Sequence, residues 1–178
     1  AAPPDTNKAT HSALRDENPA YRAAAGASPP TCWAKPARVR NQNTQMPATP
    51  SRAEAGLPEQ GFVFCCFNTN YKISPAVFAV WMRLLQRTPG SVLWLLQDNA
   101  EAAAHLRASA EAAGVNPARL VLVPRVPMPE HLARQRLADL FLDTLPYNAH
   151  TTTSDALWVG LPVLTCLGES FPGRVAAS

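Results

Sequence analysis

An α/β fold built on a doubly wound parallel sheet is what this sequence predicts, and three observations lead to it. Short apolar runs of strand length alternate five times with stretches that have helical spacing. Apolar residues follow one another in these runs rather than occupying every second position, which is typical of strands covered on both faces. The links between runs and helices are short, as in the strand–helix–strand units of a parallel sheet.

The five predicted strands are the runs of consecutive apolar residues, which are rich in side chains that favour strands. They span residues 62–67, 91–96, 119–124, 137–144 and 163–166. The last run contains Cys166, which is expected to be a buried strand residue.

Helices are predicted in the intervals between these strands. Ser74 is a suitable N-cap for the first helix, with Pro75 at its first position. Asn99 opens a second, alanine-rich helix, which Gly114 closes. The third helix is predicted to start at residue 129 and the fourth to span 152–159.

Composition and charge divide the 178 residues into two parts. Residues 1–55 hold seven Lys or Arg against four Asp or Glu, with eight prolines and few large apolar side chains. Such a segment buries too little apolar surface to offset its ordering entropy, so we predict that it is disordered or loosely attached. Residues 56–178 hold nine basic and nine acidic residues and are predicted to form one globular domain. Because that domain is neutral, nucleic acid is not expected as a partner.

The sequence also indicates where the protein works. No window reaches the roughly 18 consecutive apolar residues of a membrane-spanning helix, so a membrane is not expected as a partner. No secretory signal is visible. The four cysteines include no C-x-x-C pair, which argues against a zinc site and a disulfide framework. A reducing cytoplasm is therefore the expected location.

Polar residues gather in three loops that follow predicted strands, at 68–74, 125–130 and 146–153. Ligands of doubly wound sheets bind outside the carboxyl ends of the strands, where these loops are expected to meet. In the last loop, His150 and the hydroxyls of residues 151–154 come at the start of a predicted helix, which is a favourable place for an anion. These hydroxyls are expected to add hydrogen-bond donors for phosphate oxygens, although ordinary helix capping is the alternative. Asp155 is expected in the first turn, as an acceptor for sugar hydroxyls.

Two further groups of side chains are candidates for a nucleotide site. Lys72 is the single lysine of residues 56–178, and its ammonium suits a diphosphate, although most lone lysines are solvated surface charges. His131 and Arg134 are three residues apart on one helical face, where they could contact a base or ribose or simply form a polar face. No metal-binding spacing, no G-x-G-x-x-G and no P-loop motif occurs.

Several stretches carry a family likeness, notably GFVFCCFNTNYKISP, PGSVLWLL and EHLARQRLADLFLDTLPYNAHTTTSDALWVGLPVLTC. With them, residues 56–178 resemble the carboxyl-terminal catalytic half of the O-linked N-acetylglucosamine transferases, including the SPINDLY-like members. The resemblance implies that the sheet is the nucleotide-binding, Rossmann-like half of a GT-B glycosyltransferase. It also implies inverting transfer of N-acetylglucosamine from UDP-GlcNAc to Ser or Thr of proteins. No metal and no cofactor besides this co-substrate is expected, and tetratricopeptide repeats are expected upstream.

The resemblance assigns roles to the candidate residues. Lys72 matches the lysine that stabilises the leaving diphosphate. Asp155 matches the acceptor for ribose hydroxyls, and Thr69 stands at a donor-site position where animal members have Gln. The pyrophosphate is expected at His150, Thr151 and Thr152, and the uridine at His131 and Arg134.

Other functions remain open at this stage. Met128 stands where animal members have a Lys near the ribose, and SPINDLY-type members use GDP-fucose. A GT-B transferase with another nucleotide sugar, or with a lipid or glycan acceptor, is therefore one alternative. A nucleotide-binding fragment without turnover is another. The chain resembles only the donor half of such an enzyme, so it is expected to be inactive by itself.

Overall fold

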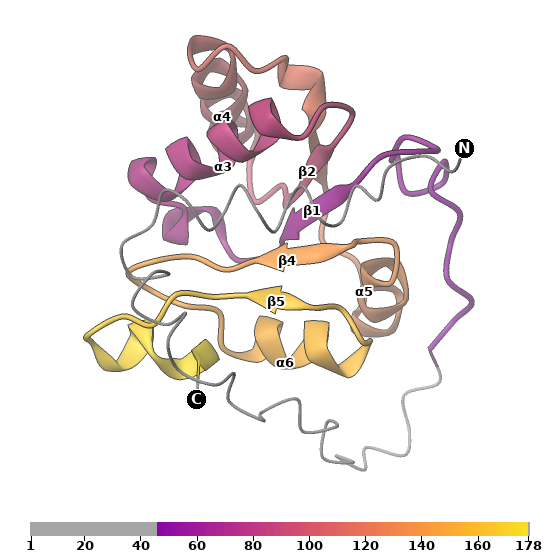
Figure 1. Ribbon diagram of the computed structural model, residues 1–178. Coiled ribbons are helices and arrows are strands. Elements are labelled where there is room, and N and C mark those ends of the chain that lie inside the picture. Colours follow the sequence, from indigo (N-terminus) through magenta and orange to yellow (C-terminus); the bar gives the residue numbers. More distant parts are fainter. Residues whose placement is uncertain (1–45, 178) are drawn as a thin grey trace, which may run out of the picture. The chain divides into compact units, whose positions relative to one another are not determined.

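A five-stranded parallel sheet forms the centre of the computed structural model, which describes residues 46–177 (Figure 1). Its strands are β1 (Val63–Cys66), β2 (Val92–Leu96), β3 (Leu120–Val123), β4 (Leu140–Leu142) and β5 (Val163–Leu164). They lie in the order β3-β2-β1-β4-β5, and every pairing is parallel. The predicted α/β class is confirmed.

Four α-helices connect the strands: α3 (Pro75–Arg87), α4 (Ala100–Ala112), α5 (Met128–Gln135) and α6 (Thr151–Trp158). Helices α3 and α4 lie on one side of the sheet, and α5 and α6 lie on the other (Figure 1). This division follows from right-handed crossovers, because the chain moves outward from β1 to β3 and then returns to place β4 on the other side of β1. The sheet is therefore doubly wound.

The helices begin where the sequence places their caps. The side chain of Ser74 accepts a hydrogen bond from Val77 N at the start of α3, and that of Asn99 accepts one from Ala102 N at the start of α4. At the amino end of β1, Gly61 has a φ of 105° and lies against the backbone of Gly90. A side chain there would collide with the Gly90 carbonyl, so glycine is required.

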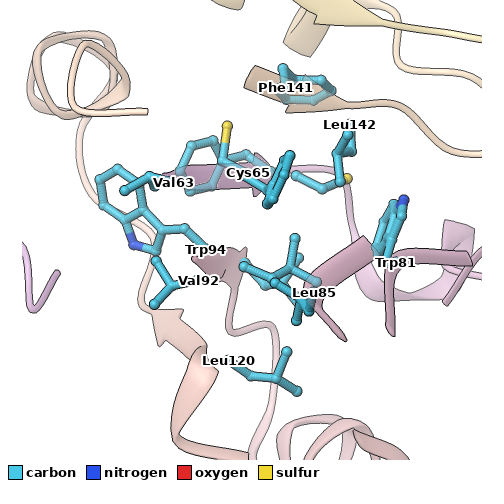
Figure 2. Packing of buried hydrophobic residues seen from close by; sticks show 14 of the residues in the cluster. Val63, Cys65, Trp81, Leu85, Val92, Trp94, Leu120, Phe141 and Leu142 are labelled. Atoms are coloured by element: carbon cyan, nitrogen blue, oxygen red, sulfur yellow. The ribbon is translucent and has the colours of Figure 1, made fainter. Parts of the chain in front are cut away.

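The core consists of side chains from the central strands packed against the helices (Figure 2). Trp94 of β2 and Phe141 of β4 are fully buried, and Trp81 of α3 packs against the same cluster. Cys65 and Cys66 of β1 are also fully buried, and burial raises the pKa of Cys66 to about 12. These two thiols are therefore protonated core side chains.

Short 3₁₀ helices, which the sequence did not indicate, complete the fold. They are η1 (Asn70–Lys72), η2 (Pro117–Arg119), η3 (Phe171–Gly173) and η4 (Val175–Ala177). The predicted burial of Cys166 is wrong: β5 ends at Leu164, so Cys166 lies beyond the strand and is exposed. The strand predicted from residue 137 begins only at Leu140, because the backbone N–H groups of Leu137 and Ala138 still bond to the last turn of α5.

Ordered structure starts before the predicted boundary at residue 56. A turn over residues 51–57 is closed by backbone hydrogen bonds, and Leu57 belongs to the core. Arg52 donates to Gly61 O at 2.8 Å and lies 3.6 Å from the Asp139 carboxylate. The remainder of the segment predicted to be disordered, residues 1–45, lies outside the described residues.

No helix within residues 46–177 has both the length and the apolar character needed to cross a membrane.

Candidate functional site

The strand order places the candidate site between β1 and β4. Successive strands run outward from β1 through β2 to β3, and the next strand, β4, lies on the opposite side of β1. At such a reversal the connections leave in opposite directions, which opens a crevice at the carboxyl ends of the two strands. The loop after β1 carries Thr69 and Lys72, and the loop after β4 leads to His150 at the start of α6.

Asn68, two residues after the end of β1, connects the two sides of the crevice. The residue is 2% exposed. Its amide nitrogen donates to Thr144 Oγ1 at 2.9 Å and to Asp143 Oδ1 at 3.3 Å, both beyond the end of β4. Its amide oxygen accepts from Thr152 Oγ1 at 2.6 Å, in the first turn of α6. One buried side chain thus fixes the end of β4 and the start of α6 relative to β1.

The direction of these hydrogen bonds follows from the Asp143 carboxylate, which only accepts. The Asn68 amide nitrogen must face Asp143, so the amide oxygen faces Thr152. Thr152 therefore donates its hydroxyl hydrogen to Asn68 and presents lone pairs on its other side. The expectation that this hydroxyl adds a donor for phosphate is corrected, because its hydrogen is already used.

Lys72 ends η1 and reaches across the crevice. Its Nζ donates to Asn148 O at 3.0 Å and lies 4.1 Å from the centre of the Tyr147 ring. Tyr147 in turn stacks on His150, with ring centroids 5.2 Å apart. Within residues 46–177 no carboxylate pairs with this ammonium. Its positive charge is therefore held at the start of α6 without a neutralising partner in the described part of the chain.

The start of α6 offers backbone N–H groups that its N-cap side chain does not cap. His150 is the N-cap residue and makes no side-chain cap hydrogen bond, although its carbonyl accepts from Thr153 N and Ser154 N. Uncapped N–H groups and the helix dipole favour an anion at this position. Asp155 is the fifth residue of the helix and not in the first turn, because α6 begins one residue earlier than predicted. Burial raises the pKa of the Asp155 carboxyl.

His131 and Arg134 form a second group beside the end of β1. Arg134 Nε donates to His131 Nδ1 at 3.2 Å, which confirms that the two residues share one face of α5. The His131 ring meets Phe67 edge-on with centroids 4.9 Å apart, and the Arg134 guanidinium lies 5.3 Å from the Phe67 ring centre. Arg134 Nη1 also donates to Pro124 O at 3.0 Å. Arg134 is 8% exposed, and its Nη2 has no hydrogen-bond partner among the described residues.

This environment fixes the charge and tautomer of His131. Burial, followed by the charges of Arg134 and Arg125, lowers its pKa from 6.5 to about 4. The imidazole is therefore neutral at pH 7, and because Nδ1 accepts from Arg134, its hydrogen is on Nε2. A neutral ring with one N–H donor is suited to a carbonyl or hydroxyl oxygen of a ligand.

Comparisons with known proteins agree with this arrangement. The sequence model described as Glycosyl transferase family 41 matches residues 23–178. The chain belongs to glycosyl transferase family 41. The match begins well before residue 56, which corrects the expectation that the family likeness starts near there; residues 23–45 of the match lie outside the described part.

Individual relatives also match this chain over most of its length. The chain is 40% identical over 142 residues to a probable UDP-N-acetylglucosamine–peptide N-acetylglucosaminyltransferase, SEC, of Arabidopsis thaliana, covering 79% of this chain and 14% of the relative. It is 41% identical over 128 residues to the corresponding transferase of Caenorhabditis elegans, covering 72% and 11%. A probable SPINDLY transferase of Solanum lycopersicum is 34% identical over 152 residues, covering 79% and 16%. The chain thus spans about a sixth or less of the length of these relatives.

A solved structure supports the fold assignment. A mutant of the O-GlcNAc transferase from Thermobaculum terrenum matches with a TM-score of 0.64 and 36% identity, covering 66% of this chain and 23% of that chain. The sheet described above is therefore the Rossmann-like half of a GT-B glycosyltransferase, as the resemblance implied.

The structure of this family member brings most of the predicted site residues together. Lys72, His150 and Thr152 lie at the crevice, linked through Asn148, Tyr147 and Asn68. Thr69 precedes η1 at the same strand end, and Thr151 is the first residue of α6. His131 and Arg134 form a neighbouring pair, joined to the crevice through Phe67, which directly precedes Asn68. Among the described residues, no side-chain hydrogen bond links Asp155 to either group.

Sequence reasoning missed the residues that hold these side chains in place, namely Asn68, Asp143 and Asn148. Asp143 Oδ1 accepts from Thr144 N at 2.7 Å and Ala149 N at 2.6 Å, and its Oδ2 accepts from Thr165 Oγ1 at 2.6 Å. A carboxylate that ends an apolar strand just before a turn was the available signal.

Within residues 46–177, no group of three or more His, Cys, Asp or Glu is arranged to hold a metal ion.

The lowered pKa of His131 leads to a prediction about stability. Below pH 6.5 the unfolded chain binds a proton at this histidine that the folded chain does not bind until about pH 4. The contribution of His131 to the free energy of unfolding is therefore expected to fall as the pH drops from about 6.5 to about 4, and to change little below that. His131→Asn, whose amide oxygen can still accept from Arg134, should flatten this part of the pH profile in urea unfolding. The same substitution at the exposed His105 is the control, and an identical flattening there would contradict the prediction.

Proposed function

We propose that this chain is the donor-nucleotide half of a protein O-glycosyltransferase that transfers N-acetylglucosamine from UDP-GlcNAc to Ser or Thr hydroxyls with inversion. The observation that carries the proposal is the Lys72 ammonium, held 3.0 Å from Asn148 O at the uncapped start of α6. Family membership supports the reaction class. The donor UDP-GlcNAc and the peptide acceptor are supported by the relatives, which are named as UDP-N-acetylglucosamine–peptide N-acetylglucosaminyltransferases.

The chemistry needs a stabilised leaving group. The acceptor oxygen forms a bond to the anomeric carbon while the bond from that carbon to the diphosphate oxygen breaks, and the hydroxyl hydrogen passes to a base. Negative charge grows on the departing UDP. The Lys72 ammonium and the dipoles of the N–H groups at the start of α6 stabilise this negative charge, so no metal ion is required for this step.

Two buried polar atoms beside Lys72 support a ligand at this place. Asn148 Oδ1 and His150 Nε2 have no hydrogen-bond partner among the described residues, although each is shielded from solvent. A buried polar atom without a partner is uncommon in native proteins and calls for an explanation such as a catalytic role or a bound water or ion. We assign the diphosphate and the adjoining sugar to this position, with His150, Thr151 and Thr152 beside them and Thr69 across the crevice.

The nucleoside is placed next to Phe67. The neutral His131 offers its Nε2–H to a base or ribose oxygen, and Arg134 holds that ring in position. Asp155 supplies a carboxylate for the ribose hydroxyls, as the family resemblance implies. Met128, which begins α5 and is 52% exposed, offers no charge at the ribose.

The other donors and acceptors remain distinguishable by experiment. A transferase that uses GDP-fucose would prefer GDP over UDP in a binding panel and would transfer fucose. A lipid or glycan acceptor would be labelled in place of peptide, and a fragment without turnover would bind nucleotide only.

We place the protein in the cytoplasm with tetratricopeptide repeats upstream. The free Cys65, Cys66 and Cys166 are consistent with a reducing compartment.

Binding of UDP to the 178-residue chain tests the proposal directly. Titration calorimetry in EDTA is expected to show binding without added metal. Asp155→Ala should weaken it by about 10- to 150-fold, the loss of one hydrogen bond to a charged group. Thr152→Val should also weaken binding, because it removes the hydrogen bond to Asn68 that fixes the start of α6. Ser154→Ala is the matched control, because Ser154 lies on the same helix and is exposed. Binding that requires metal, or that responds equally to all three variants, would contradict the proposed site.

A further inference from the structure

Asp98 connects the two loops to which Lys72 and His131 belong. It follows β2, the strand next to β1, and its side chain is 20% exposed. Its Oδ2 accepts from the backbone N–H of Asn70 at 2.7 Å, and its Oδ1 accepts from Arg125 Nη2 at 2.8 Å. One carboxylate therefore contacts the loop after β1 and the loop after β3 at the same time.

The first of these contacts supplies what η1 lacks. Asn70 is the first residue of this three-residue helix and Lys72 is the last. The backbone N–H groups at a helix start need an acceptor, which is usually the side chain of the N-cap residue. Thr69, the N-cap of η1, makes no such bond. Asp98 takes that place from a neighbouring strand and leaves the Thr69 hydroxyl out of the capping interaction.

The second contact places a positive charge near the nucleoside side of the site. Arg125 lies between β3 and α5, and its charge, after burial and Arg134, contributes to the lowered pKa of His131. The Arg125 side chain is 64% exposed, and Asp98 is the carboxylate that holds it. The Asp98 side chain thus keeps the loop of Lys72 and the loop beside His131 at a fixed separation.

We infer that Asp98 is a positioning residue for Lys72. It fixes the start of η1 on β2, and this sets where the Lys72 ammonium meets the leaving group, two residues further on. The inference rests on the proposed function, because it assigns Asp98 to the same reaction. Asp98 itself touches neither donor nor acceptor, and it acts through the backbone of Asn70.

The kinetic test uses the protein expressed from its complete coding sequence. Asp98→Ala is expected to lower kcat by about 10- to 100-fold, the range for a small misplacement of a catalytic group, with the donor KM changed less than about threefold. Asp98→Asn keeps an oxygen that can accept from Asn70 and should recover most of the rate. Arg125→Ala is the comparison variant: it removes the ion pair and leaves the bond to Asn70, so it should lower kcat by much less than Asp98→Ala. An unchanged kcat in Asp98→Ala would overturn the inference.

A double-mutant cycle separates positioning of Lys72 from general damage. In a Lys72→Met background, Asp98→Ala should lower kcat by less than about twofold, because the group that it positions is gone. The same 10- to 100-fold loss in both backgrounds would show that Asp98 does not act through Lys72. If Lys72→Met alone has no effect on kcat, the proposed function fails, and the inference that rests on it fails as well.

Hydrogen exchange gives a readout that does not depend on activity. The amides of residues 69–73 should exchange faster in Asp98→Ala than in the wild type, and Arg125→Ala should leave them unchanged. Unchanged exchange in Asp98→Ala would overturn the inference whatever the kinetics show. A loss of rate together with unchanged exchange would therefore count against Asp98 while leaving the proposed function standing.

Discussion

Replacing Lys72 by methionine is expected to lower kcat by about 100-fold or more, with a much smaller change in the donor KM. The ammonium meets charge that develops as the diphosphate leaves, so it stabilises the transition state more than the bound substrate. Lys72 Nζ lies 4.1 Å from the centre of the Tyr147 ring and 3.0 Å from Asn148 O, so the charge is already in position before the reaction. Methionine is also an unbranched side chain, one atom shorter than lysine, and it removes the charge.

Steady-state transfer to a peptide by the complete protein measures this effect. Lys72→Arg keeps the charge on a broader, planar group, and a partial recovery is expected from it. Binding of UDP to Lys72→Met, measured separately, shows whether the site is still formed. An unchanged kcat with a raised KM would mean that Lys72 only binds the donor and that the proposed mechanism is wrong.

Asp143→Ala is expected to lower the free energy of unfolding by about 3 kcal/mol or more, because several donors lose their acceptor at once. Asp143 Oδ1 accepts from the backbone N–H groups of Thr144 and Ala149, and also from the Asn68 amide at 3.3 Å. Replacement by alanine leaves the backbone N–H groups of Thr144 and Ala149 without this acceptor, while the Asn68 amide keeps its bond to Thr144 Oγ1 at 2.9 Å. The loop that carries Tyr147 and Asn148 is then no longer tied to the end of β4, so UDP affinity should fall as well.

Two variants show which oxygen carries this effect. Asp143→Asn can keep an oxygen toward the backbone N–H groups and turn its nitrogen toward Thr165, so a smaller loss is expected. Thr165→Val removes only the 2.6 Å bond to Oδ2 and should cost about 1 kcal/mol. Urea unfolding followed by tryptophan fluorescence measures all three variants. A loss in Asp143→Ala no greater than that in Thr165→Val would contradict this account.

Much of the fold could be predicted because its signals are local. Runs such as 91–96 are almost entirely apolar, and the observed β2 is Val92–Leu96. Ser74 and Asn99 cap their helices as the sequence suggests, since capping involves only neighbouring residues. The error at residue 137 has a local cause too: an apolar residue just before a strand can instead end the preceding helix, as Leu137 does.

The candidate site was less predictable because its contacts join distant parts of the chain. Lys72 and His150 could be singled out by residue type and by their place after strands. Asn68 is bonded to Asp143, 75 residues further along, and to Thr152, 84 residues further along. Neither partner can be read from the neighbourhood of Asn68, so its role in the crevice was missed. The direction of the Thr152 hydroxyl depends on the same distant carboxylate.

By itself, the sequence determined the fold class, the positions of the strands and helices, the three loops at the carboxyl ends and the family likeness. Only the tertiary structure decided that β4 lies beside β1, which makes the crevice fall between Lys72 and the start of α6. It also decided that His131 is neutral and that Asp98 caps η1. The physical reason is the same in each case. Strand pairing, burial and the choice of hydrogen-bond partner depend on groups brought together from separate parts of the chain, and no local pattern of residues encodes them.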